Sequence, residues 1–137
     1  MSRTLIYATL SADAASAVPG SLGALGVVPE AVGAAESVDS PRSHPFITTR
    51  WGNVSVGVGP SHIQLLDVWV HDDSRDYLRI DGILNRVKAL LEAIESMHFT
   101  EGWITQIEWQ GSSPDLRDDG YDTVTRNSTF KVIGSTR

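Results

Sequence analysis

The residue types best suited to chemistry stand together at His71, Asp72 and Asp73. An imidazole and neighbouring carboxylates are common ligands of divalent metal ions. None of the four histidines, however, belongs to a two-ligand pattern such as HExxH, whose spacing places two imidazoles on one helix face. A solvated connection between a strand and a helix, with an aspartate capping the helix, explains the same three residues. We favour this plainer interpretation, so the sequence predicts neither a metal site nor any other cofactor.

A second group of charged residues occupies positions 115–122, where four carboxylates and one guanidinium fall within eight residues. Asp119 and Gly120 form a strong turn dipeptide in this segment. Three interpretations are open: a solvated surface loop, a calcium loop, or a loop that contacts another subunit or lines a pore. The calcium loop is disfavoured because the EF-hand spacing and its closing glutamate are absent. The sequence by itself favours the solvated loop, since charge runs usually form surface.

No stretch of the sequence has the pattern of a nucleotide site or a catalytic nucleophile. The glycine-rich piece 57–61 lacks the lysine of a phosphate-binding loop and precedes an expected strand rather than a helix. There is no GxSxG motif, and no serine is accompanied by a neighbouring base and an orienting acid. We therefore expect a protein that is not an enzyme.

Composition narrows the class of protein further. The chain has 137 residues, which suits a single domain over 1–137 with its own core. It has no cysteine, so stability must come from packing and association rather than from disulfides. Its formal net charge of -6 is unfavourable for a protein that grips nucleic acid through released counterions. We expect a soluble protein without a membrane partner, because no secretory signal or bilayer-spanning segment is evident.

Two helices are predicted from apolar residues that recur at steps of three and four. The first spans about residues 3–17 and ends at a Pro-Gly pair. The second begins near Ser74, is capped by Asp73 or Ser74, and continues to Met97, a length of roughly 35 Å at 1.5 Å per residue. Residues 20–45 are rich in Gly, Ala, Ser and Pro, and we expect them to form a long loop that is mobile in the isolated protein.

Strands are predicted where β-branched and aromatic residues cluster or alternate with polar ones. The Gly-Asn pair at 52–53 indicates a turn, and the most apolar strand, 62–70, suits the centre of the sheet. Between 103 and 110 the odd-numbered residues share one face and the even-numbered ones the other, which predicts a dry side and a wet side. The predicted strands are 46–51, 54–58, 62–70, 104–109 and 123–132.

This order of elements predicts an α+β domain. We expect an antiparallel sheet of about four strands, with the long helix and the short N-terminal helix packed on one face. The chain also has four tryptophans, a residue type enriched in cores and in the centres of interfaces. Trp69 suits the core, whereas Trp51 beside a turn and Trp109 at a strand end are candidates for interface contacts.

Three blocks of sequence resemble the tail terminator proteins of long-tailed, siphovirus-like bacteriophages, especially those that infect actinobacteria. The resemblance lies in the order and spacing of the blocks, which contain no catalytic signature, and it covers roughly two thirds of the chain. The blocks are HPFITTRWG (44–52), then LDVWVHD (66–72) with DYLRID (76–81) and the helix, then IEWQG (107–111) with LRDDGYD (116–122) and TRN (125–127).

The resemblance implies a small α+β subunit that forms a hexameric ring on the last ring of the tail tube. Such a ring stops tube polymerisation and presents a surface to the head completion or neck proteins. The implied partners are other copies of the chain, the major tail tube protein and the neck protein. The protein would be assembled in the host cytoplasm and reside in the virion, at the head-tail joint. DNA would pass through the lumen without sequence-specific binding, which suits the negative net charge.

On this resemblance, charged residues near the two acidic segments become candidates for lumen or intersubunit contacts. They are Asp72, Asp73, Arg75, Asp115, Arg117, Asp118 and Asp119. Two other functions stay open. One is another component of the same joint, a head-tail connector or tail completion protein. The other is a small enzyme or ligand-binding module that uses the His71 to Asp73 cluster.

Overall fold

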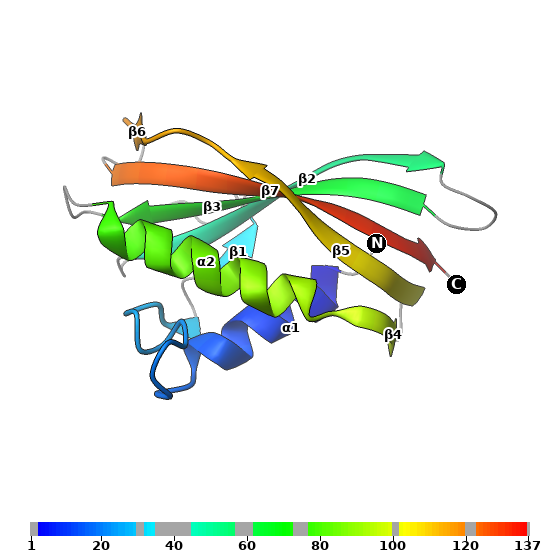
Figure 1. The fold of residues 1–137 in the computed structure, drawn as a ribbon, viewed down its shortest axis with the longest axis horizontal. Coiled ribbons are helices and arrows are strands. Elements are labelled where there is room, and N and C mark those ends of the chain that lie inside the picture. The colour runs from blue at the N-terminus through cyan, green and yellow to red at the C-terminus, as the bar shows by residue number, and fades with distance from the viewer. Residues whose placement is uncertain are drawn as a thin grey trace.

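The computed structural model describes residues 3–29, 32–34, 45–56, 62–72, 77–99, 102–119 and 123–136. They form a twisted sheet with two helices on one side of it (Figure 1). The elements are α1 (Arg3–Ala14), β1 (Val32–Ala34), β2 (Phe46–Val56), β3 (His62–Asp72), α2 (Leu78–Glu92), β4 (Glu95–Phe99), β5 (Gly102–Ser112), β6 (Leu116–Asp118) and β7 (Thr123–Thr136). The predicted α+β class is confirmed.

The sheet runs in the order β1, β2, β3, β7, β5, β4, with β6 added beside β7. Its pairs are antiparallel except for β1 with β2. The predicted strands 104–109 and 123–132 lie within β5 and β7, which pair with Trp109 opposite Phe130. β3 lies between β2 and β7, so the most apolar predicted strand does occupy a central place. Among the described residues the sheet has seven strands, because the predicted strands 46–51 and 54–58 form the single strand β2 and three short strands, β1, β4 and β6, were not predicted.

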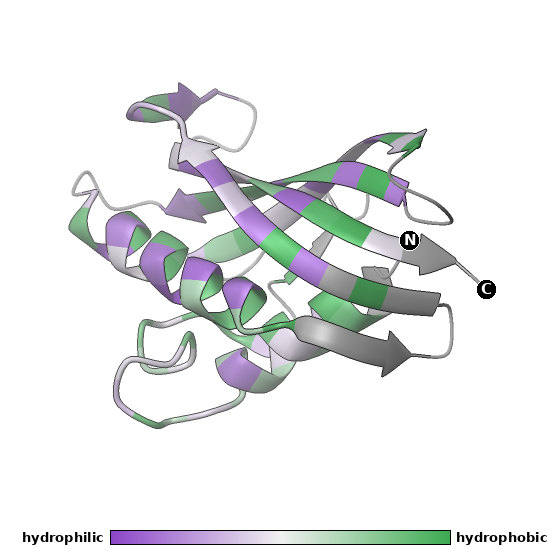
Figure 2. Ribbon diagram, turned by 45° about the vertical axis from the view of Figure 1, so that its right-hand side comes forward, coloured by the Kyte–Doolittle hydropathy of each residue, from purple (hydrophilic) through white to green (hydrophobic). Residues whose placement is uncertain are grey.

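The core lies between the helices and the sheet. α2 contributes apolar residues at steps of three and four, visible in Figure 2 as hydrophobic bands between hydrophilic ones. Burial of one large apolar side chain stabilises a fold by about 1.5–3 kcal/mol, so this layer holds the helices in place. The fully buried residues that build it include Ile6, Leu10, Leu66, Val68, Val70, Ile80, Ile83, Val87, Leu91, Ile104, Phe130 and Val132.

The second helix is shorter than predicted. It has 15 residues and ends at Glu92, although the apolar period continues to Met97. The residues beyond it form β4, in which Glu95 lies opposite Gln106 of β5. Hydrogen bonding to the sheet edge therefore overrides the helical period. Neither this helix nor any other in the described residues is long and apolar enough to cross a membrane.

The start of α2 also differs from the prediction. The residue at its N-cap position is Tyr77, which makes no capping hydrogen bond through its side chain. The predicted caps, Asp73 and Ser74, lie outside the described residues. Asp81 in the first turn supplies a negative charge where the helix dipole favours one.

The segment between α1 and β2 is better packed than its composition suggested. Leu22 and Val27 are almost fully buried and belong to the core. Residues 32–34 form β1, which pairs in parallel with β2. From residue 20 to 28 the segment has no helix or strand, as expected of a loop, and its mobility stays a prediction. Residues 30–31 and 35–44 lie outside the described part of the chain.

Bulges explain two further differences. β2 continues through 52–53, the predicted turn, because its register with β3 shifts just after Trp51 without ending the pairing. In β5 the register shifts between Ile104 and Gln106. An extra residue on one strand turns the following side chains to the other face. Ile104 and Ile107 are therefore both buried in the core, although strict alternation places them on opposite faces.

Candidate functional site

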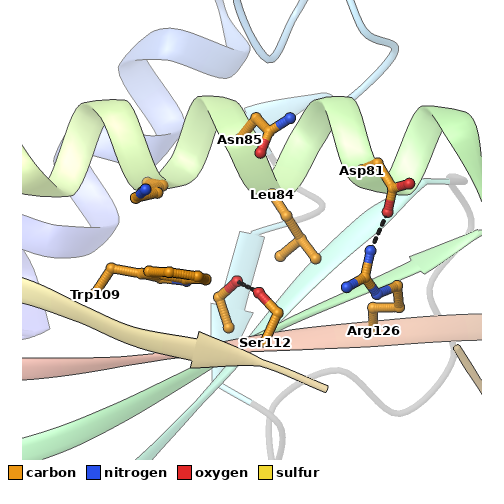
Figure 3. Close-up of a pocket in the computed structure, with 8 residues that line it drawn as sticks. Asp81, Leu84, Asn85, Trp109, Ser112 and Arg126 are labelled. Atoms are coloured by element: carbon orange, nitrogen blue, oxygen red, sulfur yellow. Dashed lines mark hydrogen bonds and ion pairs between the residues drawn. The ribbon is translucent and has the colours of Figure 1, made fainter. Parts of the chain in front are cut away.

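A groove lies between α2 and the neighbouring strands β5 and β7 (Figure 3). Its volume is about 490 Å³, within the range of sites that bind small molecules. One wall comes from the face of α2 that turns toward these strands. The residues that line the groove are Asp81, Leu84, Asn85, Lys88, Trp109, Ser112, Arg126 and Ser128.

Trp109 and Lys88 form one end of this groove. The Lys88 ammonium lies 4.4 Å from the centroid of the Trp109 ring, a cation–π contact. Lys88 also lies 4.0 Å from the Glu92 carboxylate, one helical turn further along α2. Trp109 nevertheless remains 40% exposed. A large aromatic surface with this exposure is a suitable anchor for another protein segment.

Arg126 of β7 forms the other end. Its Nη1 donates to the carboxylate of Asp81 in α2, and its Nε donates to the backbone carbonyl of Ser113 at 3.1 Å. Its Nε also lies 3.6 Å from the Asp115 carboxylate. The guanidinium thus joins α2, β7 and the segment after β5. The Arg126 side chain is only 23% exposed, so solvent screens these contacts less than it screens a pair on open surface.

The chemistry that the groove can perform is limited. The Ser112 and Ser128 hydroxyl oxygens lie 2.7 Å apart and hydrogen-bond to each other. A serine nucleophile needs a general base, and no histidine is among the lining residues. The one lining carboxylate, Asp81, is held by Arg126. Six of the eight lining residues are polar or charged, and of the two apolar ones Trp109 is exposed whereas Leu84 is only 4% exposed.

The cluster around His71 lies at the end of β3, on the sheet face opposite the helices. The His71 ring stacks on Phe46 with centroids 4.5 Å apart and planes at 6°. Its Nε2 lies 3.2 Å from the Thr48 hydroxyl and its Nδ1 lies 3.2 Å from the Thr123 hydroxyl. Both nitrogens thus have protein partners, and the residue is only 3% exposed.

A metal site at this cluster finds no support in the described residues. They contain no group of three or more histidines and carboxylates close enough to hold an ion. The Asp118 carboxylate of β6 lies 3.9 Å from Nδ1 of His71. Asp72 points to the helix face instead, where its two carboxylate oxygens accept bonds from Arg79 at 2.6 and 2.5 Å. Asp73 lies outside the described residues.

The burial of Asp72 bears on its predicted role in lumen or intersubunit contacts. Its side chain is fully buried, whereas that of Arg79 is 40% exposed. Direct contact of the Asp72 carboxylate with a neighbouring subunit would require this ion pair to open. Removing one partner of a buried pair leaves an uncompensated charge, so the pair is first of all an element of the fold. Arg75, predicted with it, lies outside the described residues.

The acidic segment after β5 is partly a strand rather than a loop. Its residues Leu116 to Asp118 form β6 against β7. Asp115 and Arg117 are 60% exposed and Asp119 is 95% exposed, and Arg117 Nε lies 3.4 Å from the Asp119 carboxylate. The structure thus places these charges on open surface around β6, while Asp118 is half-buried beside the His71 cluster.

The two predicted interface tryptophans occupy different surroundings. Trp51 is half-buried in β2 and packs against the core, whereas Trp109 lines the groove and is exposed. Sequence reasoning did not find the groove itself, because Lys88 and Asp81 are ordinary charged residues of an amphipathic helix. In the sequence, Arg126 was singled out only as a member of the TRN block at 125–127. No local sequence signal indicates that Arg126 meets Asp81, 45 positions away.

The likeness of this chain to known proteins lies in its fold. No family model matches the chain, and no curated protein matches it. Its fold is similar to that of a chain in a solved structure described as the virion of a native gene transfer agent (GTA) particle. The match has a TM-score of 0.70 and 19% sequence identity, and it covers 94% of this chain and 90% of that chain. The likeness therefore concerns the fold of nearly the whole of both chains.

Proposed function

We propose that this chain is a structural virion protein that acts as the tail terminator of a long-tailed, phage-like particle. Six copies form a ring at the end of the tail tube, stop its polymerisation and join the tail to the head. The observation that carries the proposal is the fold shared with a chain of a virion, over 94% of this chain and 90% of the other. The order and spacing of the three sequence blocks support the same conclusion from separate features.

A ring of this kind needs surfaces that differ on the two sides of each subunit. Identical head-to-tail contacts close when the rotation between neighbours divides a full turn. The chain has suitable features on its surface: the groove at Trp109, and the edge strand β4. Neither feature needs a catalytic group, and the groove has no histidine to activate its serines.

The distribution of charge supports a lumen through which DNA passes. The net charge of the chain is -6, and Asp115 and Asp119 expose 60% and 95% of their side chains. Carboxylates repel phosphates, so a lumen lined by them lets DNA move without holding it. We assign the surface around β6, with Asp115, Arg117, Asp118 and Asp119, to the lumen or to contacts between subunits.

The partners follow from the position at the joint. They are further copies of the chain, the major tail tube protein on one side and a head completion or neck protein on the other. The protein resides in the virion at the head-tail joint after assembly in the host cytoplasm. The proposed function needs no cofactor, because the geometry of the ring is enough to cap the tail tube and join it to the head.

Electron microscopy of the purified protein, alone and mixed with tail tubes of the same particle, tests the proposal. We expect sixfold rings that cap one end of each tube, and tubes that stop growing when the protein is added. A connector of the same joint forms a ring but does not end tube growth. A protein that stays monomeric at high concentration and leaves tube growth unchanged contradicts the proposal.

A further inference from the structure

The last described residues of β2 include two exposed valines, Val54 and Val56, which we call the tip; residues 57–61, between β2 and β3, lie outside the described part of the chain. The Val54 and Val56 side chains are 53% and 84% exposed. The end of β2 and the start of β3 lie side by side at the right of Figure 1, at one end of the sheet. Exposed valines at this end of the sheet leave apolar area in water that association would remove.

Register places the tip valines on the sheet face that carries the helices. Val54 lies opposite Gln64, and Gln64 lies opposite Val132, a core residue. Side chains directly across from each other share a face. The tip thus continues the apolar face of the sheet beyond the end of its helical cover. Gln64 Nε2 also donates to the carbonyl of Gly52 at 2.8 Å, which holds the bulge next to the tip in place.

The charged residues of the groove do not require a charged ligand. These residues already have partners: Lys88 with Trp109 and Glu92, and Arg126 with Asp81 and Asp115. A charged ligand would have to break these contacts to be neutralised. What the groove offers without such a cost is the exposed ring of Trp109, because Leu84, the other apolar lining residue, is only 4% exposed. The tip segment, Gly-Asn-Val-Ser-Val at 52–56, has no charge and matches this requirement.

The tip cannot reach the groove of its own subunit. Val56 pairs with His62, which pairs with Gly134 of β7, whereas the groove reaches β7 at Ser128. Six residues of a strand span roughly 20 Å at about 3.3 Å each. Tip and groove therefore lie toward opposite ends of the sheet, the arrangement that a head-to-tail contact between copies requires.

We propose that the tip of one copy inserts Val54 and Val56 into the groove of the next copy, against Trp109. This inference rests on the proposed ring and names the two surfaces that join its subunits. Each copy gives one tip and receives one, so every subunit of a closed ring has both apolar surfaces covered.

Cysteine cross-linking tests this contact directly, because the chain has no cysteine of its own. The variant Val56→Cys with Ser112→Cys carries one thiol at the tip and one in the groove. A disulfide forms only where the two Cα atoms come within about 4.4–6.8 Å. Under mild oxidation we expect a ladder of covalent oligomers on denaturing gels that ends at the closed ring. The control pair Val18→Cys with Ser112→Cys uses a valine that is 65% exposed in the turn after α1, and should give no ladder.

A second measurement separates the contact from the proposed function. Val56→Asp should lower the fraction of protein in rings at least tenfold, with folding intact by circular dichroism, whereas Val18→Asp should leave ring formation unchanged. Rings that form without the 56–112 cross-link, or that tolerate Val56→Asp, overturn this contact and leave the tail terminator function standing. Unsubstituted protein that neither forms rings nor caps tubes overturns both.

Discussion

Arg86 of α2 binds Asp13 of α1 through two hydrogen bonds, Nε to Oδ2 at 2.9 Å and Nη2 to Oδ1 at 2.7 Å. Asp13 Oδ2 also accepts a bond from the Leu22 backbone N–H at 2.8 Å. One carboxylate thus joins the two helices and the segment that follows α1. The hydrogen bonds from Arg86 lower the pKa of Asp13 below 3.8 despite its burial, and the Leu22 N–H acts in the same direction.

The Asp13–Arg86 pair predicts that the free energy of unfolding depends on pH in the acidic range. Because the pKa of Asp13 is lower in the folded chain than in the unfolded chain, its contribution is complete above about pH 4 and is lost as the pH falls through the lowered value. Asp13→Asn should lower the free energy of unfolding at pH 7 by about 1–2 kcal/mol, the lower part of the range for charged hydrogen bonds, because Arg86 is partly exposed. Urea denaturation at pH 7 and at pH 3 measures the difference, which should shrink at pH 3. Asp119→Asn is the control; equal losses in both variants would contradict the assignment.

Two glycines should respond in opposite directions to a methyl group. A Cβ on Gly82, inside α2, would meet only the Leu25 methyl carbons, at 3.7 and 4.0 Å. Gly82→Ala should therefore stabilise the protein by up to about 1 kcal/mol, through the lower entropy of the unfolded chain. A Cβ on Gly23 would lie 2.0 Å from the Ser16 carbonyl oxygen. Gly23→Ala should lower the melting temperature sharply or prevent folding, and thermal unfolding followed by circular dichroism compares the two variants. A gain of stability in Gly23→Ala would contradict the close approach.

Local patterns explain why much of the fold could be predicted from the sequence. The helical period of Ile80, Ile83 and Val87 and the alternation in β3 arise from single elements that face one core. The features that were predicted wrongly depend on contacts between segments that are distant in the sequence. The apolar period of α2 runs on past Glu92, and only pairing with β5 turns 95–99 into a strand. No local sequence pattern near Gly23 predicts its close approach to Ser16 in the segment after α1.

The candidate site was harder to predict for the same reason. The acidic residues after β5 stand out in the sequence, and the structure does place Asp115 and Asp119 on open surface. The groove, by contrast, exists only where α2 crosses β5 and β7, and its charged members look like ordinary surface residues until they pair. Asp72 is the opposite case. It stands out in the sequence as part of an acidic run, yet in the structure it is a buried partner of Arg79.

His71 gives a prediction that separates a structural role from metal binding. Both ring nitrogens already contact threonine hydroxyls, so added Zn²⁺ should not raise the melting temperature, and purified protein should hold far less than one ion per chain by elemental analysis. His71→Phe should keep the stack on Phe46 but leave Thr48 and Thr123 without the imidazole. An unsatisfied buried hydroxyl costs about 1–3 kcal/mol, and urea denaturation measures the loss. Stoichiometric zinc that disappears in this variant would contradict the structural role.

Arg126 predicts how folding and assembly are coupled at the groove. Arg126→Lys keeps the charge, but an ammonium is a compact point charge without the planar fork of a guanidinium and cannot reproduce the contacts to Asp81, the Ser113 carbonyl and Asp115 together. We expect a loss of about 1–2 kcal/mol in the free energy of unfolding, with faster amide hydrogen exchange around Ser113.

The same variant should also assemble less well, because Arg126 holds α2 at its distance from β7 and so sets the width of the groove. Light scattering across a concentration series should show ring formation shifted to higher concentration, by tenfold or more. Arg50→Lys is a matched control, since Arg50 is exposed in β2 and does not line the groove. Unchanged assembly in Arg126→Lys, together with the expected loss of stability, would mean that the shape of the groove does not govern the contact between subunits.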